Sequence, residues 1–422
     1  MPKKIIKKKK ENKRLTAKEV ISSAKLEKKI NKKFSMLYGR PSKPLRIGSL
    51  FSGIGGFEQA LNLLKVKYQV EFACDSDKFV KQAYFANHGK KISKEHWYDD
   101  VINFSKKHAD VYRNKIDLLV GGPPCQSFSI IGKHGGLRDT RGDLVSHFIK
   151  IIKKTNPKIF IFENVKGLLI IQDGMAWEIV RKKFDNLGYK IHTNILNSKN
   201  YGIPQNRERL FIIGFRNKKI DYAWPKPWPL EKMMSDFLEP KTNKKYLLPK
   251  KGIDFVLKER NRRKRFTNVN ELIQSTQKAN QQYNWHGDFV SVDYKTYMDR
   301  YTLSDLVRKF VMDDGSKSFK AKPKTDLEVA RTILSTCHKM HRAGVDNYIK
   351  RSNGKDIRRL TPRECLNLMG WVDKKYNFIK FITKYEGMQI SDTQLYRQAG
   401  NSIVVWVAAQ ILSTLRFDKL GI

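Results

Sequence analysis

The residues with the clearest capacity for chemistry surround Cys125. The stretch GGPPCQSFS, residues 121–129, directly follows the apolar segment 116–120, which has the composition of a buried strand. Two prolines stiffen the backbone just before the cysteine, so the thiol would be presented at a fixed position beyond the strand. A lone cysteine is more often a small buried apolar residue, whereas a thiolate is a strong nucleophile. The stretch alone leaves both interpretations open.

Charged side chains accompany two further strand-like segments. Glu163 follows the apolar segment 159–162, where a protonated carboxyl group beside the cysteine loop can donate a proton to a substrate ring. Arg207 and Arg209 alternate in the stretch QNRER, so both point to one face of a strand. Guanidinium groups suit a base carbonyl or phosphates. A surface position for the glutamate and structural ion pairs of the arginines with Glu208 or Glu163 are the alternatives.

A glycine-rich turn indicates a nucleotide-like ligand. The stretch FSGIGGF, residues 51–57, separates an expected strand from an expected helix, and Asp75 ends the next strand. Glycines let the backbone approach a ligand closely, and an acidic residue after the next strand is positioned to bind ribose hydroxyls. By itself, a glycine-rich turn can bind many kinds of nucleotide, and in some proteins it only allows neighbouring elements to pack closely. Together, the two features predict a cofactor that contains adenosine.

Short apolar runs and helical segments alternate from Leu45 onward. We expect strands at 45–51, 71–74, 116–120, 159–162 and 210–215, and helices at 56–64, 77–87, 144–154, 361–369 and 402–415. This alternation is typical of α/β proteins in which helices cover both faces of a parallel sheet. Because ligands of such sheets bind beyond the C-terminal ends of the strands, the sequence predicts a Rossmann-like, mostly parallel sheet with the residues above at one edge.

Composition divides the chain into four regions. Residues 1–44 hold 16 Lys or Arg against three Glu and are expected to form a basic, partly flexible arm, with a short amphipathic helix as the alternative. Residues 45–224 carry the strand-helix pattern of a catalytic and cofactor-binding domain. Residues 225–350 lack that pattern and are expected to form a smaller, irregular domain. Residues 351–422 return to helical character and are expected to complete the catalytic domain.

The charge balance indicates a polyanionic partner. The chain has 84 Lys plus Arg against 41 Asp plus Glu, a formal net charge of +43, and such side chains release counterions from phosphate backbones. A low-GC coding bias that enriches Lys, Ile and Asn is the alternative. The four cysteines form no CxxC pair, which argues against disulfides or a metal site and fits a reducing cytosol. No apolar run reaches the roughly 18 residues of a membrane span, and the lysine-rich start lacks the apolar core of a secretory signal.

The order and separation of these motifs resemble the DNA cytosine-5 methyltransferase family of the bacterial or phage restriction-modification type. The resemblance extends from Leu45 to Leu412 and includes DTRGDL at 139–144, RLTPRE at 359–364 and QAGNS at 398–402, which is expected to open the last helix. It implies a class I S-adenosylmethionine-dependent methyltransferase fold, with a smaller target-recognition domain at 225–350. S-adenosylmethionine would be the methyl donor, S-adenosylhomocysteine the product and double-stranded DNA the substrate.

The resemblance implies which residues bind the cofactor. Asp75 would hold the ribose, and Asp100 with Val101 would face the adenine. Leu144 and Asn401 would complete the pocket around the methionine. The full expected set is Phe51, Gly53, Ile54, Gly55, Asp75, Asp100, Val101, Pro123, Leu144 and Asn401.

The resemblance also implies a covalent mechanism. Cytosine C5 is too weak a nucleophile to take a methyl group unaided, so Cys125 would add to C6 and later leave. Glu163 would hydrogen-bond ring N3 and the exocyclic amine, and Arg209 would contact the cytosine carbonyl, with Arg207 nearby. The target cytosine would be flipped out of the duplex, and residues 126–143 would close over it.

Target recognition is expected from residues 225–350, which contain a basic run and several aromatic side chains. The basic run could instead only bind backbone phosphates, without recognising bases. The expected DNA contacts are Gln126, Ser129, Arg207, Lys258, Arg260, Arg262, Arg263 and Thr332.

Two positions depart from the family pattern. Ser49 stands where many members have Asp, and Trp406 interrupts the Val-Pro-Val type of final helix. Neither position belongs to the expected catalytic set.

Three alternatives accompany this interpretation. A relative that methylates transfer RNA would share the catalytic set, although the long region 225–350 and the absence of a Cys-Phe-Thr stretch in it favour DNA. A catalytically silent DNA-binding relative would be expected to lose Cys125, Glu163 or the arginines, and a dinucleotide-dependent oxidoreductase has no need of the Pro-Cys loop. We expect a monomer in the bacterial cytosol, associated with the nucleoid through DNA, with a cognate restriction endonuclease for the same site as a candidate partner.

Overall fold

A seven-stranded sheet organises the protein. The computed structural model describes residues 39–124, 144–239, 286–291, 327–333, 344–350, 357–371, 384–385 and 388–422. The strands are β1 (Leu45–Leu50), β2 (Tyr68–Cys74), β3 (Trp97–Tyr98), β4 (Leu118–Gly121), β5 (Ile159–Val165), β6 (Lys190–Asn197) and β8 (Glu208–Phe215). Their order is β3-β2-β1-β4-β5-β8-β6. Only β8 is antiparallel to its neighbours, β5 and β6, so the predicted mostly parallel sheet is confirmed.

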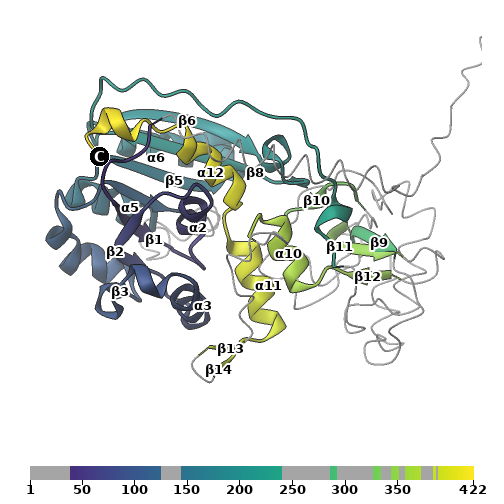
Figure 1. Ribbon diagram of the computed structural model, residues 1–422. Coiled ribbons are helices and arrows are strands. Elements are labelled where there is room, and N and C mark those ends of the chain that lie inside the picture. Colours follow the sequence, from purple (N-terminus) through teal and green to yellow (C-terminus); the bar gives the residue numbers. More distant parts are fainter. Residues whose placement is uncertain are drawn as a thin grey trace, which may run out of the picture.

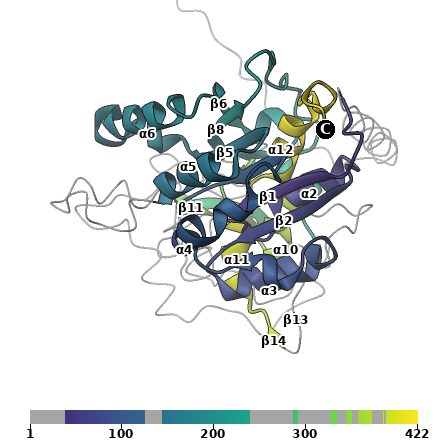
Figure 2. The ribbon, with the colours of Figure 1, turned by 90° about the vertical axis from the view of Figure 1, so that its left-hand side faces the viewer.

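Helices cover both faces of the sheet (Figures 1 and 2). One face carries α2 (Gly56–Leu63), α3 (Lys78–His88) and α12 (Val405–Ser413), and the other carries α4 (Val101–Asn103), α5 (Leu144–Thr155) and α6 (Met175–Asp185). Strand β5 illustrates why. Ile159 and Ile161 belong to the first apolar core and Phe160 and Phe162 to the second, because successive strand residues point to opposite faces.

The predicted elements differ from the observed ones mainly at their ends. Asp77 is the N-cap of α3, and its side chain accepts hydrogen bonds from the Phe79 and Val80 backbone amides. Thr361 forms a capping box with Glu364 at the start of α10 (Pro362–Leu368). The stretch QAGNS was expected to open the last helix, but it ends α11 (Asp392–Asn401), and α12 begins only at Val405. That expectation was wrong because the extended backbone at Ser402 separates two helices.

Strand β6 and helices α6 and α11 were absent from the sequence-based prediction. Strand β6, with the sequence KIHTNILN, lies at the edge of the sheet and is mostly half-buried. Edge strands carry mixed polar and apolar residues because one side remains in contact with water. The continuous apolar signal that identifies the central strands is therefore missing from β6.

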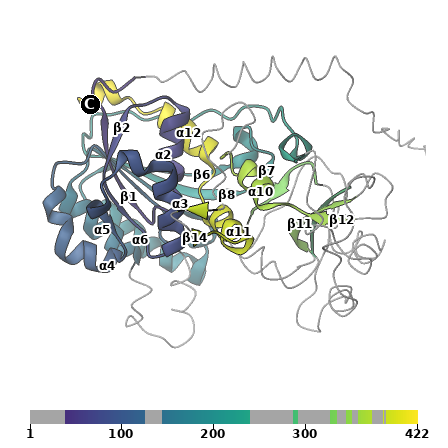
Figure 3. The ribbon, with the colours of Figure 1, turned by 60° about the horizontal axis from the view of Figure 1, so that its bottom comes forward.

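Short strands lie beyond the main sheet. Strand β7 (Gln205–Asn206) pairs in parallel with β10 (Ala330–Arg331). The others are β9 (His286–Ser291), β11 (Gly344–Lys350) and β12 (Ile357–Arg359) in one three-stranded sheet, and β13 (Lys384–Tyr385) with β14 (Met388–Gln389) in a hairpin-like pair. Figure 3 shows β7 and α10 between the main sheet and the β11–β12 part. Residues 327–333 thus contact the part of the chain expected to be catalytic, while the division into four regions stays a prediction.

The C-terminal segment packs on the face of the sheet that α2 covers. Helix α12 contacts α2, and its residues from Val405 to Ser413 are all buried. Trp406 fills the space above two glycines with positive φ, Gly202 and Gly370, where an added Cβ would lie 2.9 and 2.5 Å from the indole. The departure from the family pattern at Trp406 therefore has a packing reason. No helix within the described ranges is long and apolar enough to cross a membrane.

We predict that Trp406→Ala lowers the free energy of unfolding by about 3–5 kcal/mol, because the indole is 6% exposed and its removal leaves a cavity over the two glycines. Urea denaturation followed by circular dichroism measures the change. Val111→Ala is the matched control, since Val111 is 63% exposed and should change little. An equal effect of the two substitutions would contradict the packing role of Trp406.

Candidate active site

The expected site residues gather at one edge of the sheet. Parallel strands end at the same edge, and the residues that follow them are Phe51 to Gly55 after β1, Asp75 after β2, Asp100 after β3 and Gly122 to Pro124 after β4, while Glu163 lies near the end of β5. Strand β8 runs the opposite way, so it begins at this edge, with Arg209 opposite Val165. Residues from six strands are thereby brought together.

The turn after β1 is shaped by three residues with positive φ, Phe51, Gly53 and Gly55. The Gly53 amide donates to Asp75 Oδ2 at 2.9 Å, and the Asp77 amide donates to Asp75 Oδ1 at 3.0 Å. Burial raises the pKa of Asp75, while these backbone amides oppose the rise. An added Cβ at Gly53 would meet no described atom within 4 Å. The turn therefore leaves open space next to a fixed carboxylate, which fits a ligand with hydroxyl groups.

The other expected cofactor residues border the same edge. Asp100 caps α4 by accepting from the Ile102 amide at 2.7 Å and is exposed. Val101 is 8% exposed. Leu144 begins α5 and is half-buried, and Asn401 is the exposed last residue of α11. Their contacts with a cofactor stay predictions.

A buried polar cluster supports the turn from behind. Gly55 packs against His88, whose ring lies 2.5 Å from where a Gly55 Cβ would be. His88 is 1% exposed, and burial lowers its pKa to about 4. Next to it, the Tyr84 hydroxyl donates to Glu58 Oε1 at 2.8 Å, and Glu58 is fully buried. Burial raises the pKa of Glu58. This cluster was not predicted from the sequence, in which the polar Glu58 on the inner face of a helix was the available signal.

Glu163 and Arg209 form an ion pair at the end of β5. Arg209 Nε lies 3.1 Å from Glu163 Oε1, and both side chains are about 15% exposed. A Cβ on Gly122 would lie 2.7 Å from Glu163 Oε2, so a side chain at this position would displace the carboxylate from where it now lies. The Asn164 amide donates to the Pro123 carbonyl at 3.1 Å. The pair and the backbone before Cys125 are thus held against each other.

The ion pair corresponds to one of the alternatives left open for the arginines. Arg209 also donates from Nη1 to its neighbouring carbonyl, that of Glu208, at 2.8 Å. Glu208 pairs instead with Lys166, at 3.0 Å. The contact of Arg209 with a base carbonyl is compatible with this geometry and stays a prediction.

Arg207 has a different environment from Arg209. It is 4% exposed, and its guanidinium donates to the backbone carbonyls of Ile333, Gly400 and Ser402 at 3.3, 3.2 and 3.0 Å. Burial lowers the pKa of Arg207. The expected contacts of Arg207 with a base or with DNA stay predictions, and the observed partners are backbone groups.

Several expected site residues fall outside the described ranges. These are Cys125, Gln126, Ser129, Lys258, Arg260, Arg262 and Arg263. Thr332 is described and fully buried, and its hydroxyl donates to the Asn206 carbonyl at 3.4 Å. Its contact with DNA is therefore also a prediction.

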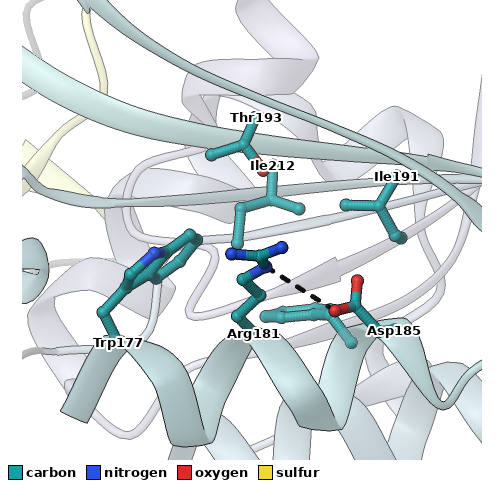
Figure 4. A pocket seen from close by; sticks show the side chains of 7 residues that line it. Trp177, Arg181, Asp185, Ile191, Thr193 and Ile212 are labelled. Carbon is teal, nitrogen blue, oxygen red and sulfur yellow. Dashed lines mark ion pairs between the residues drawn. The ribbon is translucent and has the colours of Figure 1, made fainter. Parts of the chain in front are cut away.

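A pocket of about 350 Å³ lies apart from these residues, between α6 and the strands β6 and β8 (Figure 4). Its lining residues are Trp177, Arg181, Phe184, Asp185, Ile191, Thr193 and Ile212. Arg181 and Asp185 form a loose pair, with Nε and Oδ2 3.7 Å apart. None of the expected site residues lines this pocket. Among the described residues, no group of three or more His, Cys, Asp or Glu could hold a metal ion.

Comparison with known proteins identifies relatives over most of the chain. Residues 45–416 match the model of a family described as C-5 cytosine-specific DNA methylase. The chain is 30% identical over 450 residues to the orphan methyltransferase M.SPRI of Bacillus phage SPR, which covers 88% of this chain and 97% of that protein. It is 29% identical over 379 residues to the Type II methyltransferase M.HhaI of Haemophilus parahaemolyticus, and the alignment covers 88% of this chain and 96% of that protein.

Solved structures share the fold. The Dnmt2 methyltransferase of S. pombe aligns with a TM-score of 0.58 and 20% identity, covering 90% of this chain and 100% of that one. The Entamoeba histolytica methyltransferase EhMeth aligns with a TM-score of 0.56 and 18% identity, and the alignment covers 90% of this chain and 99% of that one. At these identities the likeness concerns the fold alone.

The raised pKa of Glu58 predicts a pH dependence of stability. A carboxyl that holds its proton more tightly when folded stabilises the protein most below its ordinary value of 4.5, and this contribution is lost as the pH rises towards the folded-state pKa. Glutamine cannot titrate. We therefore expect Glu58→Gln to gain stability relative to the parent as the pH rises from 4.5 through the raised pKa that Glu58 has in the folded protein.

Unfolding free energies of the two proteins, measured with urea at several pH values, test this. Glu178→Gln is the control, since the Glu178 side chain is 57% exposed. A stability difference between Glu58→Gln and the parent that does not change with pH would contradict the prediction.

Proposed function

Since the chain belongs to the C-5 cytosine-specific DNA methylase family, we propose that it methylates carbon 5 of a specific cytosine in double-stranded DNA. The protein is a cytosine-5 methyltransferase with the class I S-adenosylmethionine-dependent fold. The observation that carries the finer proposal is the Glu163–Arg209 ion pair, packed against Gly122 and joined through Asn164 to the backbone that leads to Cys125.

The proposed role of the turn after β1 is to hold the methyl donor. The open space at Gly53 and the carboxylate of Asp75, fixed by two backbone amides, suit the ribose hydroxyls of S-adenosylmethionine. Asp100 at the next strand end would face the adenine, and Asn401 the methionine part. When bound, S-adenosylmethionine supplies an electrophilic methyl group on sulfonium sulfur.

The proposed chemistry at cytosine begins with Cys125. Its thiolate adds to C6, which moves electron density through the ring and makes C5 nucleophilic. Glu163, protonated for this step, donates a hydrogen bond to N3 and accepts one from the exocyclic amine, and so stabilises the charge that collects at N3. Arg209, already aligned by Glu163, contacts the ring carbonyl.

The later steps restore the aromatic ring. C5 would form a bond to the methyl carbon as the methyl–sulfur bond of the donor breaks and its electron pair stays on sulfur, which leaves S-adenosylhomocysteine. A base or water would then take the C5 proton, the C5–H electron pair would restore the ring double bond, and the thiolate would leave C6 with the electron pair of the C–S bond. The target carbon is inaccessible inside a duplex, so the cytosine is flipped into the site before attack. The basic residues Lys258, Arg260, Arg262 and Arg263 are proposed to bind the duplex.

The proposed cellular setting follows from this substrate. We expect a monomer that acts on DNA in the bacterial cytosol. A restriction endonuclease for the same site is its proposed companion, because methylation at C5 alters the major-groove edge that such an enzyme would read.

We predict that Cys125→Ser abolishes transfer of a tritiated methyl group to DNA and leaves DNA affinity nearly unchanged, because a serine hydroxyl is a much weaker nucleophile. Cys337→Ser, which changes another cysteine of the chain, should retain activity. The parent should also become covalently trapped on DNA that contains 5-fluorocytosine, since fluorine cannot leave as a proton. Full activity of Cys125→Ser would overturn the mechanism, and absence of both transfer and trapping in the parent would favour the silent relative.

We predict that expression of the chain produces 5-methylcytosine at one recurrent DNA sequence. Bisulfite sequencing of genomic DNA and of total tRNA from the same cells measures both substrates, with Cys125→Ser as the inactive control. Methylation confined to tRNA would replace DNA as the proposed substrate.

A further inference from the structure

Arg207 joins two segments that are distant in sequence. Its Nη1 donates to the Ile333 carbonyl at 3.3 Å, and its Nη2 donates to the carbonyls of Gly400 and Ser402 at 3.2 and 3.0 Å. All three acceptors are backbone groups, and the side chain is 4% exposed. The guanidinium therefore links two stretches of main chain through the interior.

The two segments adjoin different parts of the proposed machinery. Gly400 and Ser402 flank Asn401, the residue proposed to contact the methionine part of the cofactor. Ile333 follows Thr332, in the segment that contains β10 and comes from the region proposed to recognise DNA. Arg207 is thus bonded to the main chain on the cofactor side and to the main chain on the DNA side.

Neighbouring residues fix the same junction. Gln205 Oε1 accepts from the Ile333 amide at 3.2 Å, and its Nε2 donates to the Leu368 carbonyl at 2.9 Å. Strand β7 pairs in parallel with β10. On the other side, Trp371 Nε1 donates to the Ser402 hydroxyl at 2.7 Å. Both segments held by Arg207 are therefore themselves well anchored.

The chemistry of arginine makes this a stiff connection. The guanidinium is planar, and its donors have a fixed geometry, so it cannot follow one acceptor without turning away from another. A buried cation that loses its acceptors also pays a large desolvation cost. A displacement of the Ile333 segment is therefore transmitted to the Gly400–Ser402 segment.

We propose that Arg207 is a positioning residue that couples cofactor binding to DNA binding, through its simultaneous hydrogen bonds to Ile333 and to the two carbonyls around Asn401. The inference rests on the proposed function, because it takes one segment to border the cofactor and the other to border DNA. By thermodynamic reciprocity, DNA then tightens cofactor binding by the same factor by which the cofactor tightens DNA binding.

The test is the affinity for S-adenosylhomocysteine, measured by isothermal titration calorimetry with and without a duplex that contains a site the parent methylates. Coupling between binding sites is on the order of 5- to 150-fold, and we expect the parent to fall in this range. In Arg207→Met, the coupling factor, which is the ratio of the S-adenosylhomocysteine affinities with and without DNA, should be close to one. Arg207→Lys keeps the charge but replaces the planar guanidinium by a single ammonium group. It should give an intermediate coupling factor, and it serves as the test if the methionine variant does not fold.

Arg46→Met is the matched control. It removes a guanidinium bonded to Asp117, 3.0 Å away, at the opposite end of β1 from the site, so it should leave the coupling factor unchanged. Thermal unfolding of all the variants separates coupling from general loss of stability.

A coupling factor in folded Arg207→Met or Arg207→Lys equal to that of the parent overturns the inference and leaves the proposed function intact. A parent that binds both ligands without coupling also overturns it. A parent that binds neither ligand overturns the proposed function itself.

Discussion

The antiparallel insertion of β8 between β5 and β6 is the constraint on which the candidate site depends. Parallel strands deliver their following loops to one edge of a sheet, but residues that precede a parallel strand lie at the other edge. Because β8 runs in reverse, its first residues lie at the edge where β1, β2, β4 and β5 end. Arg209 can therefore pair with Glu163, and Arg207, two residues earlier, can turn into the junction with the C-terminal helices.

At this edge of the sheet, two side chains each lie very close to a glycine. Gly122 admits the Glu163 carboxylate next to the backbone that leads to Cys125, and Gly55 admits the His88 ring behind the turn after β1. In each case a side chain on the glycine would occupy the space of the neighbouring group. The two glycines act on different parts of the site. Gly122 lies against Glu163, and Gly55 lies in the turn that has the open space at Gly53.

The central strands and the site edge could be predicted from the sequence because each depends on a local signal. Residues 159–162 are continuously apolar, as a strand buried on both faces must be, and Asp77 and Thr361 have the side chains that cap helices. The pairing of Glu163 with Arg209 was predicted only as one alternative, since the sequence of the 45 residues between them does not show in which direction each strand runs. Strand β6 escaped prediction because its edge position allows a mixed composition.

The two arginines of the stretch QNRER show the limit of reasoning from spacing. Alternation predicts that residues two apart share one face of a strand, and it gave Arg207 and Arg209 similar roles. For Arg207 that expectation was wrong, because this residue lies between β7 and β8. Their environments differ, however, because the regular ladder of β8 begins only at Glu208. Arg207 precedes it and meets carbonyls from two other segments, while Arg209 lies within the strand and faces Glu163.

The departure at Ser49 follows from the buried cluster behind the turn. Glu58, on α2, already supplies a fully buried carboxyl there, and the Ser49 side chain lies close enough to lower the pKa of that carboxyl, against the larger rise that burial causes. An aspartate at position 49 would bring a second carboxyl to the same buried space, and two carboxyls in contact oppose each other's ionisation. Serine places a polar group there without a second charge. The chain therefore retains one acidic group beneath the turn, contributed by the helix after the turn and not by the strand before it.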